Sequence, residues 1–313
     1  MKIYSGNDIN KVLNIERDLD KLIENQKDAF INYSLGLITV PLPMQFEFHN
    51  PFGDCHIKGA SSVKYNNFVI KIASGFYDII PSGDGVILLI SRKTGIIEAI
   101  FHDEGYLTIL RTALAACLAI KITPFVITHI GVVGNGRLAK QIIQLLELIY
   151  PEIKISVYGR NDDKTRHFAS QHKNVVQASS VTNLVINNGV IISTTSSSLP
   201  IIKLNDINCN SLHIIGLGAD CIGKQEIDSQ IFNLADIIIV DSKIQAIKFG
   251  DTSSAIQSGI VKPSQLVELG SVLNNKSIIT DRNKFLISNF TGIGTQDLAI
   301  SGFVNTKLVA ENG

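Results

Sequence analysis

The fold class is decided by the stretch His129-Ile130-Gly131-Val132-Val133-Gly134-Asn135-Gly136-Arg137-Leu138-Ala139. It places the pattern G-x-G-x-x-A between an apolar run, which predicts a strand, and an amphipathic pattern over 138–150, which predicts a helix. The first glycine allows a tight bend, the second removes the Cβ that would block a pyrophosphate, and the alanine lets helix and strand pack closely. The helix N-terminus offers free N–H groups to phosphates. The stretch predicts a dinucleotide site, the alternative being a glycine-rich turn in another α/β unit.

From Val126 onward, short apolar runs alternate with helical patterns. Fully apolar strands separated by helices are typical of a parallel sheet that is covered on both faces. We therefore predict an α/β fold with a Rossmann-type doubly wound parallel sheet over residues 126–285. Its strands are expected near 126–133, 153–158, 190–192, 212–217 and 237–240.

The chain before residue 105 has a different pattern. Runs of β-branched residues, divided by Gly, Pro, Asn and Asp, predict an antiparallel sheet there. From Leu107 the apolar spacing becomes helical, and residues 294–310 predict a terminal helix.

Composition excludes several classes of protein. The 313 residues carry 28 Lys+Arg and 28 Asp+Glu, so no global positive field favours nucleic acid. The aliphatic runs are far below the roughly 18 residues of a membrane span, and the start lacks the apolar segment of a signal peptide. Four cysteines without a C-x-x-C pair predict neither disulfides nor a metal site. We expect a soluble, cytoplasmic protein with no nucleic-acid or membrane partner.

The end of the second predicted strand bears on the cofactor. It reads Val157-Tyr158-Gly159-Arg160-Asn161, with no acidic residue before Asp162. An acid there would accept hydrogen bonds from the ribose of NAD, whereas Arg suits the 2′-phosphate of NADP. The sequence thus favours NADP(H) over NAD(H), although a shift of one residue would bring Asp162 or Asp163 to that position.

Three other residues are candidates for contact with a substrate. Lys71 lies within the apolar run 69–73, and Arg111 lies on the helix that begins near Leu107. Together they could hold a carboxylate, or they could be a solvent-facing lysine and an arginine paired within its helix. Asp220 follows the apolar strand 212–217, where ligands of parallel sheets bind, but it could equally cap a turn.

The order of these features resembles the ornithine cyclodeaminase/mu-crystallin family over nearly the whole chain. The matching stretches are Val69-Ile70-Lys71, the L-T-x-x-R-T-A string at 107–113, the glycine turn, the G-A-D-x-x-G-K-x-E-I-D string at 218–228 and Thr291 to Ala299. The two long strings are far more specific than the glycine pattern.

The resemblance implies two domains and a homodimer. Residues 1–125, completed by 286–313, are expected to form an α+β substrate-binding and dimerisation domain, and residues 126–285 the NAD(P)-binding domain. Members move a hydride at the α-carbon of a small amino or imino acid, the type reaction being the lyase conversion of L-ornithine to L-proline and ammonia. The alternatives are a ketimine or iminosuccinate reductase, an amino-acid dehydrogenase, or a non-enzymatic nucleotide-binding protein like mu-crystallin.

The resemblance also assigns expected roles to residues. Lys71 and Arg111 match positions that bind the substrate carboxylate, Asp220 matches the catalytic carboxylate that exchanges protons with the amine, and Lys71 is the second expected catalytic residue. Ser82 is expected near the substrate. The expected cofactor contacts are Gly134, Asn135, Gly136, Arg137, Leu138, Gly159, Arg160, Asn161, Thr195, Ser196, Leu217, Thr291 and Gly292.

This chain departs from the family pattern in the substrate region. Pro43 stands where members commonly carry a carboxylate-binding Arg, so one cation is missing there. His56 and Lys58 supply basic groups where many members have an apolar Met-Pro. We expect Lys58 either to replace the missing Arg or to bind a further anionic group, with His56 beside it.

Overall fold

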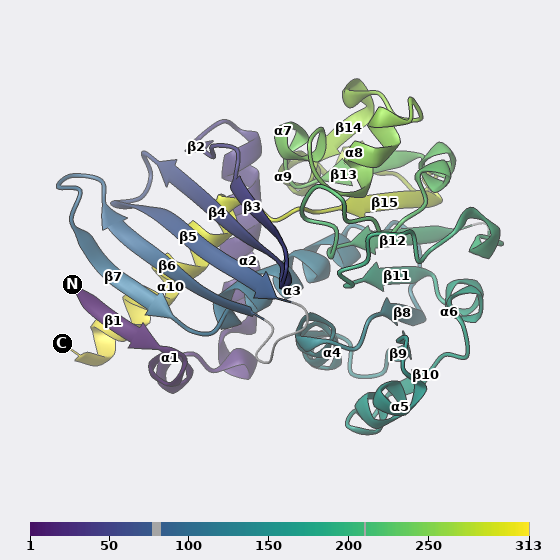
Figure 1. Cartoon of the computed structure of the whole chain (residues 1–313), viewed down its shortest axis with the longest axis horizontal. Coiled ribbons are helices and arrows are strands. Elements are labelled where there is room, and N and C mark those ends of the chain that lie inside the picture. The colour runs from purple at the N-terminus through teal and green to yellow at the C-terminus, as the bar shows by residue number, and fades with distance from the viewer. Residues whose placement is uncertain (77–82, 210, 313) are drawn as a thin grey trace. The chain divides into compact units, whose positions relative to one another are not determined.

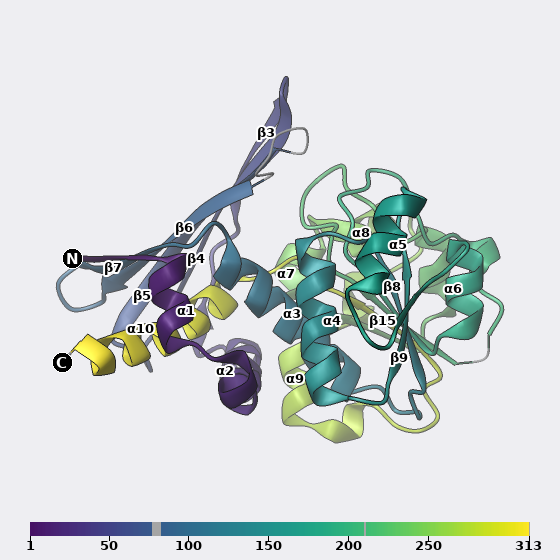
Figure 2. The same ribbon diagram turned by 90° about the horizontal axis from the view of Figure 1, so that it is seen from below.

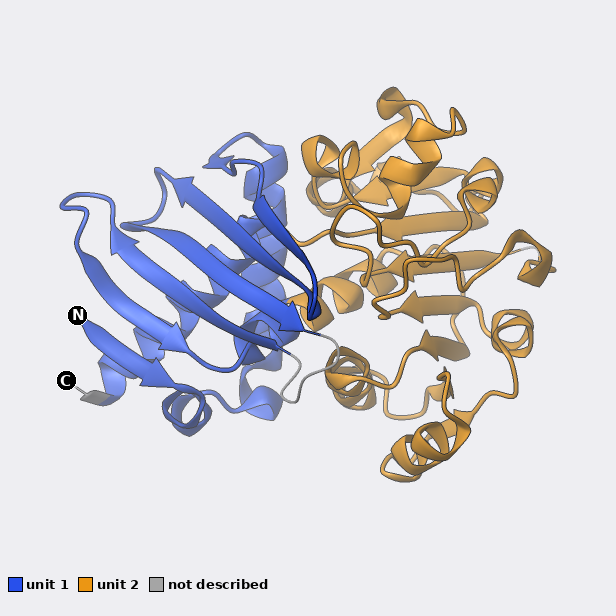
Figure 3. Cartoon of the chain, in the orientation of Figure 1, with its two compact units in different colours: residues 1–111, 293–313 blue, residues 112–292 orange. Residues whose placement is uncertain are grey.

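The computed structural model describes residues 1–76, 83–209 and 211–312. Contacts divide the chain into two compact units (Figure 3). Unit 1 comprises Met1–Arg111 and Ile293–Gly313, and unit 2 comprises Thr112–Gly292. Among the described residues, no helix combines the length and the apolar character that a membrane span requires.

Unit 1 is built on a sheet with strand order β1-β7-β6-β5-β4-β2, to which β3 is added by pairing with β4. Neighbouring strands pair antiparallel except β1 and β7, so the expected antiparallel sheet is present. The strands are β1 (Lys2–Ser5), β2 (Ile38–Thr39), β3 (Met44–His49), β4 (Phe52–Ser62), β5 (Asn67–Phe76), β6 (Gly83–Ser91) and β7 (Ile97–His102).

Three helices of unit 1, α1 (Gly6–Val12), α2 (Ile15–Ser34) and α10 (Gly294–Asn312), lie on the same side of this sheet (Figures 1 and 2). The terminal helix agrees with the sequence, but α1 and α2 occupy a segment that was interpreted only as β-rich. The missed signal in α2 is the buried set Leu19, Leu22 and Ile23, which has helical spacing. Asn14 caps this helix by accepting a hydrogen bond from the Arg17 N–H, at 2.9 Å.

Unit 2 confirms the doubly wound α/β prediction. Its strands all pair parallel in the order β10-β9-β8-β11-β12-β15-β13-β14, and Figure 2 shows α4 and α6 on opposite sides of the sheet. The strands are β8 (His129–Val133), β9 (Lys154–Tyr158), β10 (Val175–Gln177), β11 (Val190–Ser193), β12 (Leu212–Gly216), β13 (Ile237–Val240), β14 (Leu266–Glu268) and β15 (Phe285–Asn289). The helices are α3 (Tyr106–Lys121), which begins in unit 1, α4 (Arg137–Ile149), α5 (Asp162–Ser170), α6 (Val181–Asn187), α7 (Lys243–Ala246), α8 (Gly250–Gln257) and α9 (Leu269–Asn274), with short 3-10 turns η1 (Leu204–Asp206), η2 (Ser229–Leu234), η3 (Pro263–Gln265) and η4 (Lys276–Ile278).

The unit boundaries differ from the predicted ones. The predicted return to the first domain at residue 286 is wrong because β15 pairs with β12 and β13 in the middle of the unit 2 sheet. Unit 2 therefore extends to Gly292. At the other boundary, Arg111 forms hydrogen bonds with residues of α10. Unit 2 begins directly after it, at Thr112, instead of at the predicted residue 126.

The register of the unit 2 sheet positions the glycine turn. Strand β8 lies between β9 and β11, so the chain leaves β8 at the point where the strand order changes direction. In open parallel sheets ligands bind beyond the carboxyl ends of the strands at this point. The turns at 134–136, 159–160 and 194–197 therefore meet at one edge of the sheet.

Candidate functional site

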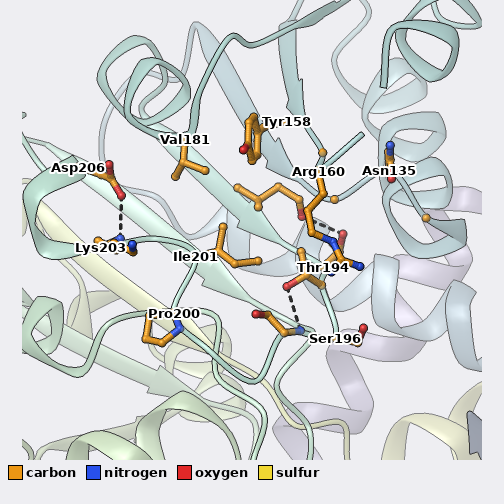
Figure 4. Close-up of a pocket in the computed structure, with 16 residues that line it drawn as sticks. Asn135, Tyr158, Arg160, Val181, Thr194, Ser196, Pro200, Ile201, Lys203 and Asp206 are labelled. Carbon is orange, nitrogen blue, oxygen red and sulfur yellow. Dashed lines mark hydrogen bonds between the residues drawn. The ribbon is translucent and has the colours of Figure 1, made fainter. Parts of the chain in front are cut away.

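A cavity of about 610 Å³ lies at this edge of unit 2 (Figure 4). Its walls come from the ends of β8, β9 and β11, from the start of α6 and from the loop that follows β11. The lining residues are Val133, Gly134, Asn135, Gly136, Tyr158, Gly159, Arg160, Val181, Thr194, Thr195, Ser196, Ser197, Pro200, Ile201, Lys203 and Asp206.

The glycine turn fits a pyrophosphate for two reasons. Gly134 has a φ of 115°, which other residues rarely adopt, and a Cβ there would collide with Thr194 Oγ1. Gly136 is the N-cap of α4, and a Cβ built on it meets no described atom within 4 Å. The N-terminus of α4 therefore faces open space, which is the arrangement that binds phosphate groups.

The cavity brings together seven of the expected cofactor residues: Gly134, Asn135, Gly136, Gly159, Arg160, Thr195 and Ser196. The expected residues Arg137, Leu138, Asn161, Leu217, Thr291 and Gly292 lie outside its lining. Asn161 instead caps α5, where its side chain accepts a hydrogen bond from the Lys164 N–H at 2.9 Å. The buried Thr291 and Gly292 are held by Asp241, whose carboxylate accepts bonds from the Thr291 hydroxyl at 3.3 Å and the Gly292 N–H at 2.5 Å.

The loop after β11 supplies lining residues that the sequence did not indicate. Lys203 is a second cation in the lining, besides Arg160, and Asp206 caps η1 by accepting a bond from the Lys203 N–H at 2.8 Å (Figure 4). This loop has no sequence pattern of its own, and the adjacency of β11 to β8 is what brings it to the glycine turn. Asp162, the acid that a shifted register would have used, is outside the lining and accepts a bond from Gln177 Nε2 at 3.2 Å.

Unit 1 contains a second candidate site, which we name the cation cluster: Lys58, Lys71, Arg111 and Asp297. Lys58 on β4 and Lys71 on β5 are direct cross-strand partners, and both side chains are buried. Like charges placed opposite each other in a sheet are destabilising. Arg111 is also buried. The cluster therefore places three buried cationic side chains near one buried carboxyl, that of Asp297.

Asp297, in the first turn of α10, holds two of these cations. Its Oδ1 accepts hydrogen bonds from Lys71 Nζ at 3.1 Å and from Arg111 Nε at 3.2 Å. Its Oδ2 is buried and has no hydrogen-bond partner among the described residues. The Arg111 side chain bonds in addition to Gln296 Oε1, through Nη1 at 3.3 Å. The role of Asp297 is a finding of the structure. The available sequence signal is an acidic residue within an otherwise apolar helical pattern, because such a residue, when buried, is usually paired.

Burial and neighbouring charge shift the pKa values in the cluster. Burial, reinforced by the charge of Arg111, lowers the pKa of Lys71 to about 7. For Asp297, burial acts to raise the pKa, but the charges of Lys71 and Arg111 outweigh it and leave the pKa below its ordinary value. The charge of Lys71 also acts to lower the pKa of Asp103. The Asp103 carboxylate, however, accepts hydrogen bonds from the N–H groups of Gly105 and Leu107. The charges of Lys71, Arg111 and Lys58 thus all act on the carboxyl of Asp297.

His56 lies two residues before Lys58 on β4, so the two side chains share a face of the sheet. It is buried, with Nδ1 3.4 Å from Gln45 Nε2 and Nε2 3.2 Å from Asp54 Oδ1. The structure therefore places the predicted substrate residue His56 beside the cation cluster. The predicted substrate residue Ser82 lies outside the described residues.

Asp220 lies in unit 2, in the loop that follows β12. Its Oδ1 accepts a hydrogen bond from Lys224 Nζ at 2.9 Å, and the Asp220 side chain is 34% exposed. An accessible carboxylate beyond the carboxyl end of a parallel strand is suited to exchange a proton with a bound ligand.

The chain is similar in sequence to curated proteins over nearly its whole length. It is 27% identical over 314 residues to an uncharacterized cyclodeaminase y4tK of Sinorhizobium fredii, covering 96% of this chain and 94% of that protein. It is 25% identical over 305 residues to alanine dehydrogenase of Archaeoglobus fulgidus, covering 94% of this chain and 92% of that protein.

The fold also matches solved structures. A Thermococcus litoralis Delta(1)-pyrroline-2-carboxylate reductase, solved in complex with NADH and L-proline, superposes with a TM-score of 0.88 at 19% identity, covering 100% of this chain and 98% of that one. The sequence profile described as the ornithine cyclodeaminase/mu-crystallin family matches residues 7–312.

Proposed function

Because the chain belongs to the ornithine cyclodeaminase/mu-crystallin family, we propose that it is an NAD(P)-dependent oxidoreductase acting at the α-carbon of a small amino or imino acid. The observation that carries this proposal is the cation cluster, in which buried Lys71 and Arg111 share Asp297 Oδ1 and buried Lys58 lies directly opposite Lys71. A buried excess of positive charge is costly unless an anion compensates it. The carboxylate of an amino or imino acid is such an anion.

The substrate carboxylate binds to the cluster through charged hydrogen bonds. Asp297 engages Lys71 Nζ and Arg111 Nε through a single oxygen, so both cations are held in place before the substrate arrives. Each charged hydrogen bond to the substrate contributes roughly 1.5–3 kcal/mol. Lys58, directly opposite Lys71, replaces the cation that is missing at Pro43.

The cavity of unit 2 holds the dinucleotide. The N-terminus of α4, open at Gly136, binds the pyrophosphate, and Arg160 with Lys203 supplies positive charge for a 2′-phosphate, which favours NADP(H). A reduced nicotinamide, when bound, supplies the hydride. Asp220 supplies a proton to the substrate nitrogen in the reductive direction and takes one in the oxidative direction.

A second candidate is the cyclodeaminase reaction, in which a diamino acid loses ammonia and forms a cyclic amino acid without net redox change. It is favoured by the full-length similarity to the cyclodeaminase of Sinorhizobium fredii. The same cations would hold the carboxylate, and Asp220 would then bind the departing or attacking amine.

The two candidates differ in their consumption of cofactor. We expect purified protein to oxidise NADPH or NADH in proportion to an added imino acid, such as a cyclic ketimine or the imine of pyruvate with ammonia. If L-ornithine with catalytic NAD⁺ instead yields proline and ammonia with no net NADH, the cyclodeaminase reaction replaces our proposal. Absence of turnover with every imino and amino acid tried, despite nucleotide binding, would indicate a nucleotide-binding protein without activity.

We also propose that the protein is a homodimer. Strand β3 of unit 1 carries three solvent-exposed apolar residues. The exposed fractions of Met44, Phe46 and Phe48 are 57%, 47% and 40%. Contiguous exposed apolar side chains are typical of protein interfaces. Sedimentation of a monomer at micromolar concentration would contradict this.

A further inference from the structure

Glu226 joins two neighbouring turns of unit 2. Its buried carboxylate accepts hydrogen bonds through Oε1 from Ser193 Oγ at 2.6 Å, from the Thr195 N–H at 2.5 Å and from Thr195 Oγ1 at 2.9 Å. Through Oε2 it accepts a bond from the Gly218 N–H at 2.6 Å. Ser193 ends β11 and Gly218 follows β12, so one side chain spans the ends of two adjacent strands.

Each of these turns belongs to a different part of the proposed machinery. Thr195 lines the dinucleotide cavity, and Gly218 opens the loop that carries Asp220. The turns are also in close contact, because a Cβ on Gly218 would lie 2.7 Å from Thr195 N and 2.8 Å from Glu226 Cδ. The Glu226 carbonyl accepts further bonds from the N–H groups of Ile201, at 2.8 Å, and Ile202, at 3.0 Å. Ile201 lines the same cavity.

A second buried carboxylate fixes Glu226 itself. Asp251 Oδ1 accepts bonds from the N–H groups of Glu226 at 2.6 Å and Ile227 at 2.9 Å, and its Oδ2 accepts one from Asn289 Nδ2 at 2.9 Å. Burial raises the pKa of both carboxyls, that of Asp251 to about 7 with a contribution from Glu226, so placing them together is costly. Fully satisfied buried polar networks of this kind fix one arrangement of the chain segments they join.

We propose that Glu226 is a positioning residue that couples the nucleotide-binding turn 194–197 to the loop 218–221, so that nucleotide binding orders the segment that carries Asp220. This inference rests on the proposed function for the role of Asp220. The coupling itself depends only on the contacts of Glu226. A carboxylate is required because all four contacts are donors, and an amide would turn an N–H toward one of them.

The first test measures the coupling without turnover. In the wild type, saturating NADPH or NADH is expected to slow amide hydrogen exchange in residues 218–225 as well as in 194–197. In Glu226→Gln the protection of 194–197 is expected to remain in part, while that of 218–225 is lost. Equal protection of 218–225 in variant and wild type would overturn the inference, whatever the activity of the protein.

The second test uses nucleotide affinity and kinetics with matched controls. Glu226→Gln should raise the nucleotide Kd and lower kcat, each about tenfold or more, while the KM of the amino or imino acid, set by unit 1, stays within about threefold. Ser193→Ala removes one hydrogen-bond donor to Glu226 from a residue outside the cavity lining. It should raise the nucleotide Kd and lower kcat by about threefold each. This variant replaces Glu226→Gln as the test if Glu226→Gln does not fold.

The control is Asp228→Asn, the same chemical change two residues away at an N-cap that Asn can retain. It should leave the nucleotide Kd and kcat within about twofold. A folded Glu226→Gln protein with unchanged Kd and kcat, or one altered only in thermal stability, would reduce Glu226 to a structural role. Lack of turnover in the wild type would defeat the proposed function but leave the Kd comparison valid.

Discussion

The glycine turn of unit 2 and the cation cluster of unit 1 are assembled in opposite ways. The turn lies within one contiguous stretch, 129–139, and is formed by a strand and a helix that are consecutive in the chain, β8 and α4. The cluster takes one residue each from β4, β5, α3 and α10, and Arg111 and Asp297 are 186 positions apart. A local pattern predicts the first, whereas only strand register and helix packing create the second. The two sites should therefore fail separately when altered.

The largest expected effect is at Asp220, which lies in unit 2 but should behave as a substrate residue. Asp220→Asn removes the proton-exchanging carboxylate, and general acid–base catalysis contributes roughly 10²- to 10⁴-fold. We expect turnover to fall by about this factor while the nucleotide Kd, measured by fluorescence titration, stays within a few fold. Unchanged turnover would remove Asp220 from the mechanism.

A substitution at Arg111 tests whether the cation cluster binds the substrate and not the nucleotide. Arg111→Met keeps an unbranched apolar stem but loses charged hydrogen bonds worth roughly 1.5–3 kcal/mol, so kcat/KM for the substrate should fall about 10- to 100-fold. Nucleotide affinity should not change. Arg17→Met, at an exposed side chain of α2, is the matched control and should have no effect on either quantity. A loss of nucleotide affinity in Arg111→Met would contradict the separation of the two sites.

The pKa of Lys71 gives the cluster a pH dependence. Since this pKa is lowered to about 7, Lys71 is protonated below pH 7 and loses its charge as the pH rises through that value. The kcat/KM for an anionic substrate, which reports the free enzyme, should therefore decline above about pH 7, by up to tenfold per pH unit. Lys71→Arg keeps its charge in this range and should abolish the decline. A profile identical in the variant would assign the titration to another group.

The smallest effect is expected from a substitution at Arg160, which tests how the cavity of unit 2 selects between NADPH and NADH. If Arg160 binds the 2′-phosphate, Arg160→Ser should raise the Kd for NADPH by roughly 10-fold, the value of a charged hydrogen bond, and leave that for NADH unchanged. Lys203→Ser should act in the same direction and more weakly. Equal affinities of the wild type for NADH and NADPH would show that neither cation selects the cofactor.

The sequence predicted well what depends on neighbours along the chain. The doubly wound sheet was predicted, as were α4 and α10 to within a few residues. So were the cavity-lining residues that lie in the glycine motif, such as Gly134 and Gly136. The sequence missed α2, because the β-branched runs that follow dominated the interpretation. It also missed Lys203, whose segment carries no pattern and reaches the cavity only through the pairing of β11 with β8.

Glycine placement, apolar periodicity and the sequence strings shared with the family are properties of the amino-acid order. The fold class, a candidate nucleotide site at the glycine turn and the candidates Lys71, Arg111 and Asp220 could therefore be inferred from it. Tertiary structure decided that Lys58 stands opposite Lys71, that Asp297 holds Lys71 and Arg111, and that Glu226 joins the ends of β11 and β12. The physical reason is that hydrogen bonds and charge interactions act over a few ångströms in space. Which distant residues come that close depends on strand register and helix packing, and these are set by the whole fold.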